Sequence, residues 1–388
     1  MGALTPPFNL FPTFVFMIHT RRTREGNLFF ILVSLLLFSS CRTGKVVAPL
    51  TFSDATQHRI DSICQQYLEE LHYPGLAVAV MQDGKALWTR GYGYADLETK
   101  RTVDPETDMF RIGSVSKTIT AAALARLYEK HRIDLDAPVS KYDITLPADK
   151  DSLTLRQIGG HLAGIRHYLG LEFFSQTHYD HVEEALDVFI HDSLLFVPGT
   201  EFGYSTYGWT LISDIMEKAT GKSFLQLIHD EVIRPLHLTD LKADLIDSTR
   251  IPRVGFYDYR NEMHERSPSV DNSNKWAGGG FLCTADDLAR FGSALVTSGY
   301  LKPATLTEFT VSQKTSDGKL TQYGIGIRCG KDDHDRSWFG HSGGSIGGTS
   351  MLLMYPDQDL VVVTLINLTS AQMNELAWKI AQMLLDQP

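Results

Sequence analysis

Apolar and polar positions follow two different spacings along the chain. Between residues 57 and 71 apolar side chains recur at every third or fourth position, which predicts an amphipathic helix. The run Leu76–Met81 is continuously apolar, and the turn pair Asp83-Gly84 separates it from Ala86–Tyr92, so we expect a buried hairpin. Near the other end the pattern predicts strands over 324–328, 337–340, 350–355 and 360–366, a turn at 357–358, and a closing helix over 371–385.

The predicted strands therefore gather at the two ends of the chain, whereas residues 115–300 are expected to form mainly helices and long loops. Strands must pair with other strands to satisfy their backbone groups. The pattern thus predicts a mixed α/β (α+β) fold, with an antiparallel sheet built from both termini, flanking helices and an inserted helical lobe. Residues 53–388 have the size of one domain with two lobes.

Composition narrows the classes of function. With 36 Lys and Arg against 46 Asp and Glu the net charge is −10, and no long basic stripe is present, so nucleic-acid binding is not expected. The 43 % share of hydrophobic residues supports a globular core rather than disorder. Four cysteines exclude a disulfide scaffold. Cys64, Cys283 and Cys329 allow at most one pair, and we expect them to be buried free thiols.

The N-terminus has the pattern of a targeting signal. Basic residues at 21–24 precede the apolar run Leu28–Phe38, and two serines and Cys41 follow it, which is typical of a secretory signal. A cysteine after two small residues resembles a bacterial lipoprotein signal, in which Cys41 would be lipidated, although Phe38 is larger than usual there. A signal anchor that is not cleaved is the alternative.

This pattern predicts the boundaries of the targeting region. Residues 1–40 are expected to be a signal peptide, of which 1–16 would lie upstream of a start at Met17, and residues 41–52 a tether. The mature protein is then expected to be an exported lipoprotein, held at the membrane by its lipid and facing the periplasm or the cell exterior.

The first chemical motif is Ser114-Val-Ser-Lys117. It opens a predicted helix, and the i, i+3 spacing places both side chains on one helix face. An amine with a lowered pKa can take the proton of a nearby serine, and a helix N-terminus directs N–H groups at developing negative charge. Alone, the motif also fits a capping serine followed by a solvated lysine.

Two further segments carry reactive side chains. Tyr204 lies in Gly203–Gly208, before the predicted helix Trp209–Thr220, where it could relay a proton, although a lone tyrosine is usually packed. Gly340–Gly344, which contains His341, leaves a predicted strand. Its small residues would let backbone approach a ligand and would free N–H groups for an oxyanion, unless they form a simple glycine-rich turn.

In this order the three motifs resemble the serine β-lactamase and penicillin-binding-protein superfamily, in the branch related to class C β-lactamases. Residues 74–79, 161–168 and 276–288 agree with that branch. The triplet Tyr204-Ser205-Thr206 and the segment 271–276 are most similar to the mitochondrial serine β-lactamase-like proteins and their bacterial relatives. The resemblance covers residues 55–388.

The resemblance implies a role for the main motif residues. Ser114 would attack a carbonyl and become acylated, while Lys117 and Tyr204 would move the proton from the serine to the leaving group. His341 stands where most relatives carry the Lys of a Lys-Thr-Gly triad. It would lie near a substrate carboxylate or tune Tyr204, and we expect it to titrate near neutral pH.

The resemblance also implies the substrate-binding groups. Backbone N–H groups of Ser114 and Gly344 would form the oxyanion hole, and Ser342 and Gly343 would line it. Thr206 replaces an Asn whose amide usually holds a substrate carbonyl. That replacement and His341 disfavour fast β-lactam turnover and favour peptide or ester substrates.

Together these features predict a serine hydrolase that works through an acyl-enzyme on a small peptide, ester or β-lactam-like substrate. A peptidase, a D-amino-acid carboxypeptidase, an esterase and a weak β-lactamase stay open. The alternative is a slowly acylated or non-catalytic protein that binds peptidoglycan or β-lactams, or a self-assembling homo-oligomer, since the branch includes a filament former. No cofactor is expected.

Two other enzyme classes are not expected. Gly340–Gly344 also matches G-x-S-x-G, but the α/β-hydrolases need a histidine after that serine and none follows Ser342. His178, His181 and the acidic run Asp332–Asp335 have no zinc-site spacing, so we expect no functional metal.

Overall fold

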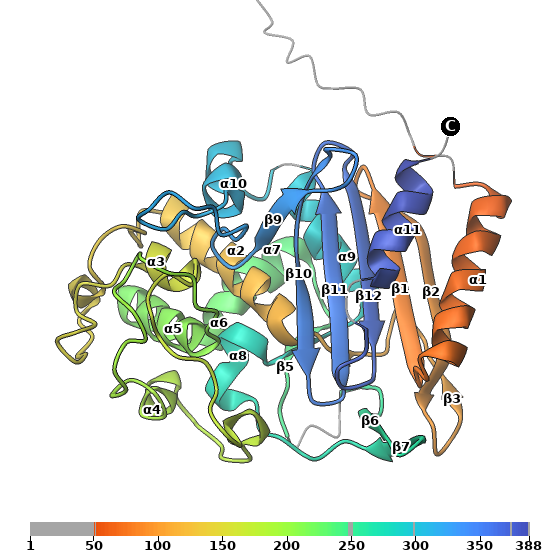
Figure 1. The fold of residues 1–388 in the computed structure, drawn as a ribbon, viewed down its shortest axis with the longest axis horizontal. Helices are drawn as coiled ribbons and strands as arrows, with labels where there is room; N and C mark the ends of the chain where they lie inside the picture. Colours follow the sequence, from red (N-terminus) through yellow and green to blue (C-terminus); the bar gives the residue numbers. More distant parts are fainter. Residues whose placement is uncertain (1–49, 51, 247–250, 298, 373–374, 387–388) are drawn as a thin grey trace, which may run out of the picture. The chain divides into compact units, whose positions relative to one another are not determined.

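A seven-stranded antiparallel sheet forms the centre of the fold (Figure 1). The computed structural model describes residues 50, 52–246, 251–297, 299–372 and 375–386. Strands from both ends of the chain meet in this sheet, as predicted, because β1 pairs with β12. The order of the strands is β3 (Arg101–Thr102), β2 (Lys85–Asp96), β1 (Gly75–Gln82), β12 (Leu360–Ile366), β11 (Gly348–Tyr355), β10 (Ser337–Ser345) and β9 (Arg328–Lys331).

Helices cover both faces of the sheet. Successive side chains of β1 alternate between two apolar layers, so that Val78 packs in one layer and Ala79 in the other. Because both faces are covered, every residue of β1, β11 and β12 is buried. The first layer contains α1 (Asp54–Glu70) and α11 (Glu375–Leu385), and the second contains α2 (Ser116–Glu129) and α9 (Ala285–Val296).

The helical lobe lies between the strands in sequence, as predicted. Three-residue strands and short helical turns connect its longer helices. Its remaining helices are α3 (Leu155–Gly159), α4 (Val182–Leu186), α5 (Tyr207–Thr220), α6 (Phe224–Ile228), α7 (Arg234–Leu236), α8 (Trp276–Gly279) and α10 (Pro303–Thr310). The turns are η1 (Gly113–Val115), η2 (Val139–Tyr142), η3 (Glu172–Phe174), η4 (His229–Ile233) and η5 (Ser273–Lys275). The small sheets contain β4 (Phe110–Arg111), β8 (Phe281–Cys283) and β5 (Leu241–Ala243), and β6 (Tyr257–Arg260) with β7 (Met263–Arg266).

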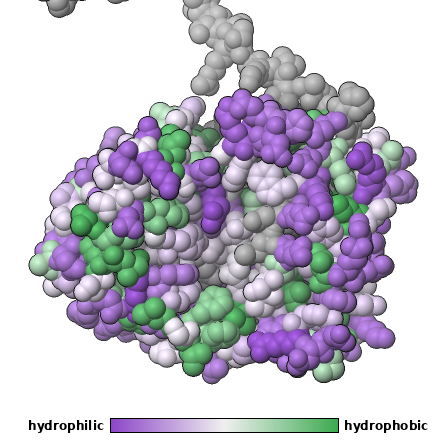
Figure 2. Space-filling model, in the orientation of Figure 1, coloured by the Kyte–Doolittle hydropathy of each residue, from purple (hydrophilic) through white to green (hydrophobic). Residues whose placement is uncertain are grey.

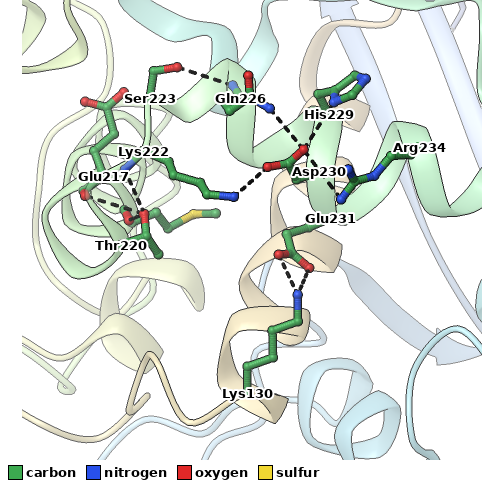
Figure 3. A network of polar contacts seen from close by, with 11 residues as sticks. Lys130, Glu217, Thr220, Lys222, Ser223, Gln226, His229, Asp230, Glu231 and Arg234 are labelled. Atoms are coloured by element: carbon green, nitrogen blue, oxygen red, sulfur yellow. Dashed lines mark hydrogen bonds and ion pairs between the residues drawn. The ribbon is translucent and has the colours of Figure 1, made fainter.

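The helix that carries the first motif is anchored at its far end. Lys130, directly after α2, donates from Nζ to both carboxylate oxygens of Glu231, at 2.6 and 2.5 Å (Figure 3). Glu231 lies in η4, whose neighbouring residue Asp230 accepts from Lys222 at 2.6 Å. Glu231 is buried and Lys130 is exposed, so the pair links η4 to the end of α2 at the protein surface.

Two predicted element boundaries are wrong. Residues 324–327 form no strand, because Gly326 has φ +72° and the chain bends there, so β9 begins only at Arg328. The last helix begins at Glu375 rather than at residue 371, because the backbone N–H of Ala371 donates to Thr349 Oγ1 at 3.1 Å and ties this segment to β11.

The described cysteines are free thiols, as expected, with Cys64 and Cys283 buried and Cys329 partly buried. Within the described ranges, no helix combines the length and apolar character needed to cross a bilayer. The predicted signal peptide, Cys41 and nearly all of the tether lie outside the described residues.

Candidate active site

Ser114 lies where a strand turns into a helix. The chain leaves β4, passes through η1 and enters α2. Gly113 has φ +48°, a region that favours glycine, and a Cβ at this position would come within 2.7 Å of the Gly344 carbonyl oxygen. The glycine therefore lets the Ser114 turn approach β10, which brings the first and third motifs together.

Lys117 is fully enclosed in the first turn of α2. Its Nζ lies 2.6 Å from the Gly278 carbonyl oxygen, 3.0 Å from Thr206 Oγ1 and 3.3 Å from Ser114 Oγ. Burial, and to a lesser degree the charge of Arg328, lowers the pKa of Lys117 well below its ordinary value. In its neutral form the amine has two N–H groups for the first two oxygens and a lone pair for the serine proton.

Tyr204 lies in the loop before α5 and contacts both other motif residues. The Lys117 Nζ is 4.9 Å from the centre of its ring, and its phenol hydrogen-bonds to the Ser114 hydroxyl. Burial raises the pKa of Tyr204 to about 12, against the lowering effects of the Ser114 hydrogen bond and of Arg328. The phenol is therefore protonated at neutral pH and can give its proton away.

His341 is enclosed within β10, and both of its ring nitrogens are engaged. Nδ1 donates to the Ser342 carbonyl oxygen at 2.6 Å, which can only accept, so in the neutral ring Nε2 accepts from the Tyr323 hydroxyl at 2.8 Å. Burial first, and the Lys117 charge second, lower the pKa of His341 to about 3. The expectation that His341 titrates near neutral pH is therefore wrong.

The His-Ser-Gly motif lies inside a strand and not after one, which corrects the sequence interpretation. Buried and half-exposed residues alternate along it, with Gly343 buried and with Ser342 and Gly344 half-exposed. A Cβ on Gly343 would come within 2.0 Å of the Ile112 carbonyl oxygen, so only glycine permits this approach to the Ser114 turn. Ser342 consequently does not occupy a strand-to-helix elbow.

β10 reaches beyond its neighbour β9. The pairing with β9 ends at Gly340, while the pairing with β11 continues to Ser345. Within the described part of the chain, residues 341–345 therefore have a strand partner on one side only. Their other edge, beside the Ser114 turn, leaves backbone groups available to a bound molecule.

Several polar residues of the site were not predicted as site residues. His161 lies with its ring 4.3 Å from that of Tyr204, and its Nδ1 accepts the Ser205 N–H at 3.1 Å. His167 accepts the Thr206 N–H at 3.2 Å. Both histidines belong to the stretch 161–168, which supported the family resemblance but carried no role. The presence of two histidines in this stretch was the sequence signal that could have identified them as site residues.

Arg328 is a second cation of the site and comes from β9. Its guanidinium is exposed and lies 5.9 Å from the centre of the Tyr323 ring. Its charge lowers the pKa values of Lys117, Tyr204 and His341. Among the described residues no carboxylate pairs with it. No sequence pattern pointed to this residue, because the surrounding segment was interpreted as a strand.

Exposed apolar side chains lie on two loops of the helical lobe. Figure 2 shows hydrophobic surface gathered over the left half of the visible face, while the right half is mostly hydrophilic. One of these loops follows His167, and the other is bonded to Gly164 through the backbone N–H of Leu195. Their exposed apolar residues are Leu169, Leu171, Phe174, Leu195 and Val197. A separate cavity of about 500 Å³ opens beside Phe202, whose ring lies 5.9 Å from that of Tyr323.

The histidines and acids considered as metal ligands have other partners. His178 Nδ1 lies 2.8 Å from the Asp271 carboxylate, and Asp332 pairs with Arg336 at 2.7 Å. Across the described ranges, no three His, Cys, Asp or Glu side chains are grouped so as to hold a metal ion.

Comparison with known proteins places this geometry in a family. The Beta-lactamase family matches residues 60–385. The human mitochondrial serine beta-lactamase-like protein LACTB is 30 % identical, over 81 % of this chain and 77 % of its own length. The D-aminopeptidase of Gluconobacter oxydans is 28 % identical, over 82 % of this chain and 60 % of its own length.

Solved structures agree on the fold. The octameric penicillin-binding protein homologue from Pyrococcus abyssi superposes with a TM-score of 0.75 at 23 % identity, over 86 % of this chain and 78 % of that one. The fold with its sheet and inserted helical lobe is thus the one shared by β-lactamases and penicillin-binding proteins. The matched sequence and the shared fold together show that the chain belongs to the serine β-lactamase-like family.

Proposed function

We propose that this protein is a serine hydrolase that forms an acyl-enzyme on Ser114. The observation that carries the proposal is the fully buried amine of Lys117, which lies 3.3 Å from the Ser114 hydroxyl, is held by Thr206 and Gly278, and has a pKa well below its ordinary value because of burial. A buried lysine with a strongly lowered pKa and no carboxylate partner is costly to maintain, and perturbed groups of this kind cluster at active sites.

The proposed reaction moves one proton through three groups. Lys117 takes the proton of Ser114, whose Oγ bonds to the acyl carbon of the substrate. When the tetrahedral intermediate collapses, the bond to the leaving nitrogen or oxygen breaks, and that atom takes a proton from the Tyr204 hydroxyl. The proton held by Lys117 then returns to Tyr204, and water releases the acyl group by the reverse sequence.

The close approach of the Ser114 turn to β10 supports an oxyanion hole at this point. Gly113 and Gly343 permit the approach, and backbone N–H groups of Ser114 and Gly344 are the proposed donors. Their attraction grows as the carbonyl oxygen gains charge, so they favour the transition state over the bound substrate. The unpaired edge of β10 would hold an extended, peptide-like substrate beside these donors.

The exposed charge of Arg328 favours a substrate that carries a carboxylate near the scissile bond. His341 is neutral and engaged at both nitrogens, so it has no charge to offer an anion. Arg328 is exposed and has no acidic partner within the described residues. Its charge lowers the pKa of Tyr204, one of the reacting groups. A guanidinium in this position matches a carboxylate in both charge and geometry.

Replacing Arg328 tests this substrate class. For a peptide with a free C-terminal carboxylate, Arg328→Gln is expected to lower kcat/KM by roughly tenfold, the cost of a lost hydrogen bond to a charged group. For the same peptide with an amidated C-terminus, the change should stay within about twofold. Steady-state kinetics on both peptides measure the difference, and Arg328→Lys is the charge-preserving control. Equal losses on both peptides would remove the carboxylate assignment.

A substrate panel tests the hydrolase proposal itself. Wild-type protein and Ser114→Ala would be compared on p-nitrophenyl esters, D-Ala-D-Ala peptides, an endopeptidase peptide and a chromogenic cephalosporin. The mechanism predicts Ser114-dependent turnover of at least one ester or peptide and slower turnover of the cephalosporin. A wild type that turns over none of them, and is not acylated, would favour the binding or scaffold alternative.

We also propose that Cys41 is lipidated and holds the protein at the membrane of the periplasm or cell surface. The support is the order of basic head, apolar run and small residues before Cys41. Cys41→Ala is expected to move the protein from the membrane fraction to the soluble fraction, because acyl chains contribute roughly 0.8 kcal/mol per buried methylene. Unchanged fractionation of the cells would contradict lipidation.

A further inference from the structure

The side chain of Thr206 is fully engaged at the centre of the site. Its Oγ1 accepts from Lys117 Nζ at 3.0 Å and hydrogen-bonds to the phenol of Tyr168. Its methyl carbon would lie 2.5 Å from a Cβ placed on Gly278, so it fills the space beside that glycine. The hydroxyl of Thr206 is therefore engaged within the protein, by Lys117 and Tyr168.

His167 lies directly against the backbone of Thr206. Its Nδ1 accepts the Thr206 N–H at 3.2 Å. Its ring packs on Tyr168 at 4.3 Å and stands edge-on to the ring of Tyr204 at 5.6 Å, with an interplanar angle of 89°. Arg166 donates to the His167 carbonyl oxygen at 2.9 Å. The hydrogen bonds to the backbone and the contacts with the two tyrosine rings thus hold this imidazole in one position and orientation.

The hydrogen bonds also determine which ring nitrogen carries the proton. Because Nδ1 accepts an N–H, the neutral imidazole must carry its hydrogen on Nε2. Burial first, then the charges of Lys117 and Lys275, lower the pKa of His167 to about 4, so the ring stays neutral around neutral pH. Nε2 has no protein partner within the described residues and is not enclosed by them.

The other two histidines of the site cannot offer such a donor. Both nitrogens of His341 are engaged, and the Nε2 of His161 is enclosed by protein. Among the described histidines beside Tyr204, His167 is thus the one that can present a free N–H to a bound molecule.

His167 and Arg328 have different neighbours in the site: the His167 ring lies 5.6 Å from the ring of Tyr204, whereas Arg328 lies 5.9 Å from the ring of Tyr323. The charge of Arg328 acts on Tyr204, His161, His341 and Tyr323 but does not contribute at His167, which instead responds to Lys275 and Glu172. A substrate whose leaving-group carboxylate meets Arg328 can extend its acyl part toward His167. The loop after His167 exposes the apolar side chains of Leu169, Leu171 and Phe174.

We propose that the Nε2–H of His167 donates a hydrogen bond to a carbonyl oxygen in the acyl part of the substrate, one amide unit away from the scissile carbonyl. The substrate class is then an N-acyl amino acid or peptide joined to its leaving group by an amide or ester bond. This inference rests on the proposed hydrolase function and assigns His167 the role of a specificity-determining residue.

Two esters of equal chain length test the proposal. N-acetylglycine p-nitrophenyl ester carries the amide carbonyl, whereas p-nitrophenyl pentanoate has methylenes in its place. His167→Phe keeps an aromatic ring but removes the donor. It is expected to lower kcat/KM on the first ester by about tenfold and on the second by less than about twofold, since only the first loses a hydrogen bond.

A second variant separates the hydrogen bond from packing. His167→Gln places an amide N–H near the position of Nε2, so it should recover most of the preference for N-acetylglycine p-nitrophenyl ester that His167→Phe loses. Circular dichroism on both variants verifies that they are folded, and His167→Leu, which also lacks the donor, replaces His167→Phe if that variant is not. Equal losses on both esters in His167→Phe, an unchanged preference in folded His167→Phe, or a failure of His167→Gln to recover the lost preference would overturn the assignment.

The failure of this inference differs from the failure of the proposed function. If a fluorophosphonate labels Ser114 and both esters are hydrolysed, but with no preference that depends on residue 167, only the role of His167 falls. If wild-type protein neither takes the label nor releases p-nitrophenol from either ester, the hydrolase proposal falls, and the role of His167 falls with it.

Discussion

Ser114→Ala is expected to abolish covalent labelling and to lower hydrolysis by roughly 10⁴-fold or more, since loss of the nucleophile leaves only the binding and oxyanion contributions. The variant should fold normally, because the change removes one hydroxyl whose hydrogen bonds to Lys117 and Tyr204 lie within a polar site. Intact-protein mass spectrometry after treatment with a fluorophosphonate measures the effect. Wild type should gain one adduct, which peptide mapping places on Ser114.

Ser140→Ala is a suitable matched control for this experiment. Ser140 lies exposed in η2 of the helical lobe, outside the proposed site, so its labelling and turnover should equal those of wild type. An adduct that persists at full yield in Ser114→Ala would show that another residue is the nucleophile. A wild type that stays unlabelled would point to the binding or scaffold alternative.

The second large effect is expected for Lys117. Lys117→Met keeps the length of the side chain but removes the proton acceptor, and it should lower kcat by roughly 10³-fold, within the range attributed to a general base. The fold should survive, because the loss of a buried amine offsets part of the cost of leaving the Gly278 carbonyl oxygen unpaired. Single-turnover acylation followed by p-nitrophenol release measures the loss, and thermal unfolding verifies the fold.

Lys117→Arg tests whether residue 117 acts as a base or only through its positive charge. A guanidinium stays protonated in proteins and cannot accept the serine proton. The arginine variant, where folded, is therefore expected to be as inactive as Lys117→Met. Recovery of acylation with arginine would mean that residue 117 acts through its charge, and the proposed proton path would be wrong.

The lowered pKa of Lys117 also gives the sign of the pH dependence. The neutral amine is the active form, so acylation should be present above the folded pKa of Lys117 and should be lost as the pH falls through it. The unfolded chain binds a proton at Lys117 below an ordinary pKa of about 10.4. Between the two pKa values the unfolded state holds more protons, so this group makes stability fall as the pH falls through that window. The pH profile of acylation in wild type, with thermal unfolding at each pH, measures both trends.

Local pattern determined much of the architecture. The alternation of side chains in Leu76–Met81, the turn at Asp83-Gly84 and the apolar run over 360–366 depend on neighbours in sequence, and the hairpin and the strand that pairs with it were predicted correctly. The pattern failed at 324–328 and at residue 371. In the first case a glycine bends the chain, and in the second a hydrogen bond to Thr349 holds it.

The spacing of residues within one helix also determined part of the site. Lys117 follows Ser114 by three positions, and a helical turn places such a pair on one face whatever the rest of the fold does. The sequence order of the motifs then identified the family. It could not reveal that the pKa of Lys117 is lowered, because this depends on burial beside Thr206 and Gly278.

Protonation states and partners were decided only by the tertiary structure. His341 is an imidazole that titrates near neutral pH in water, but here its enclosure by Tyr323 and the strand backbone keeps it neutral. Arg328 and His167 come from segments without a catalytic motif and meet the site through packing. Charge, desolvation and hydrogen bonding act through space, so the local pattern determined which residues could react, while the fold determined in which protonation state and beside which partners they do so.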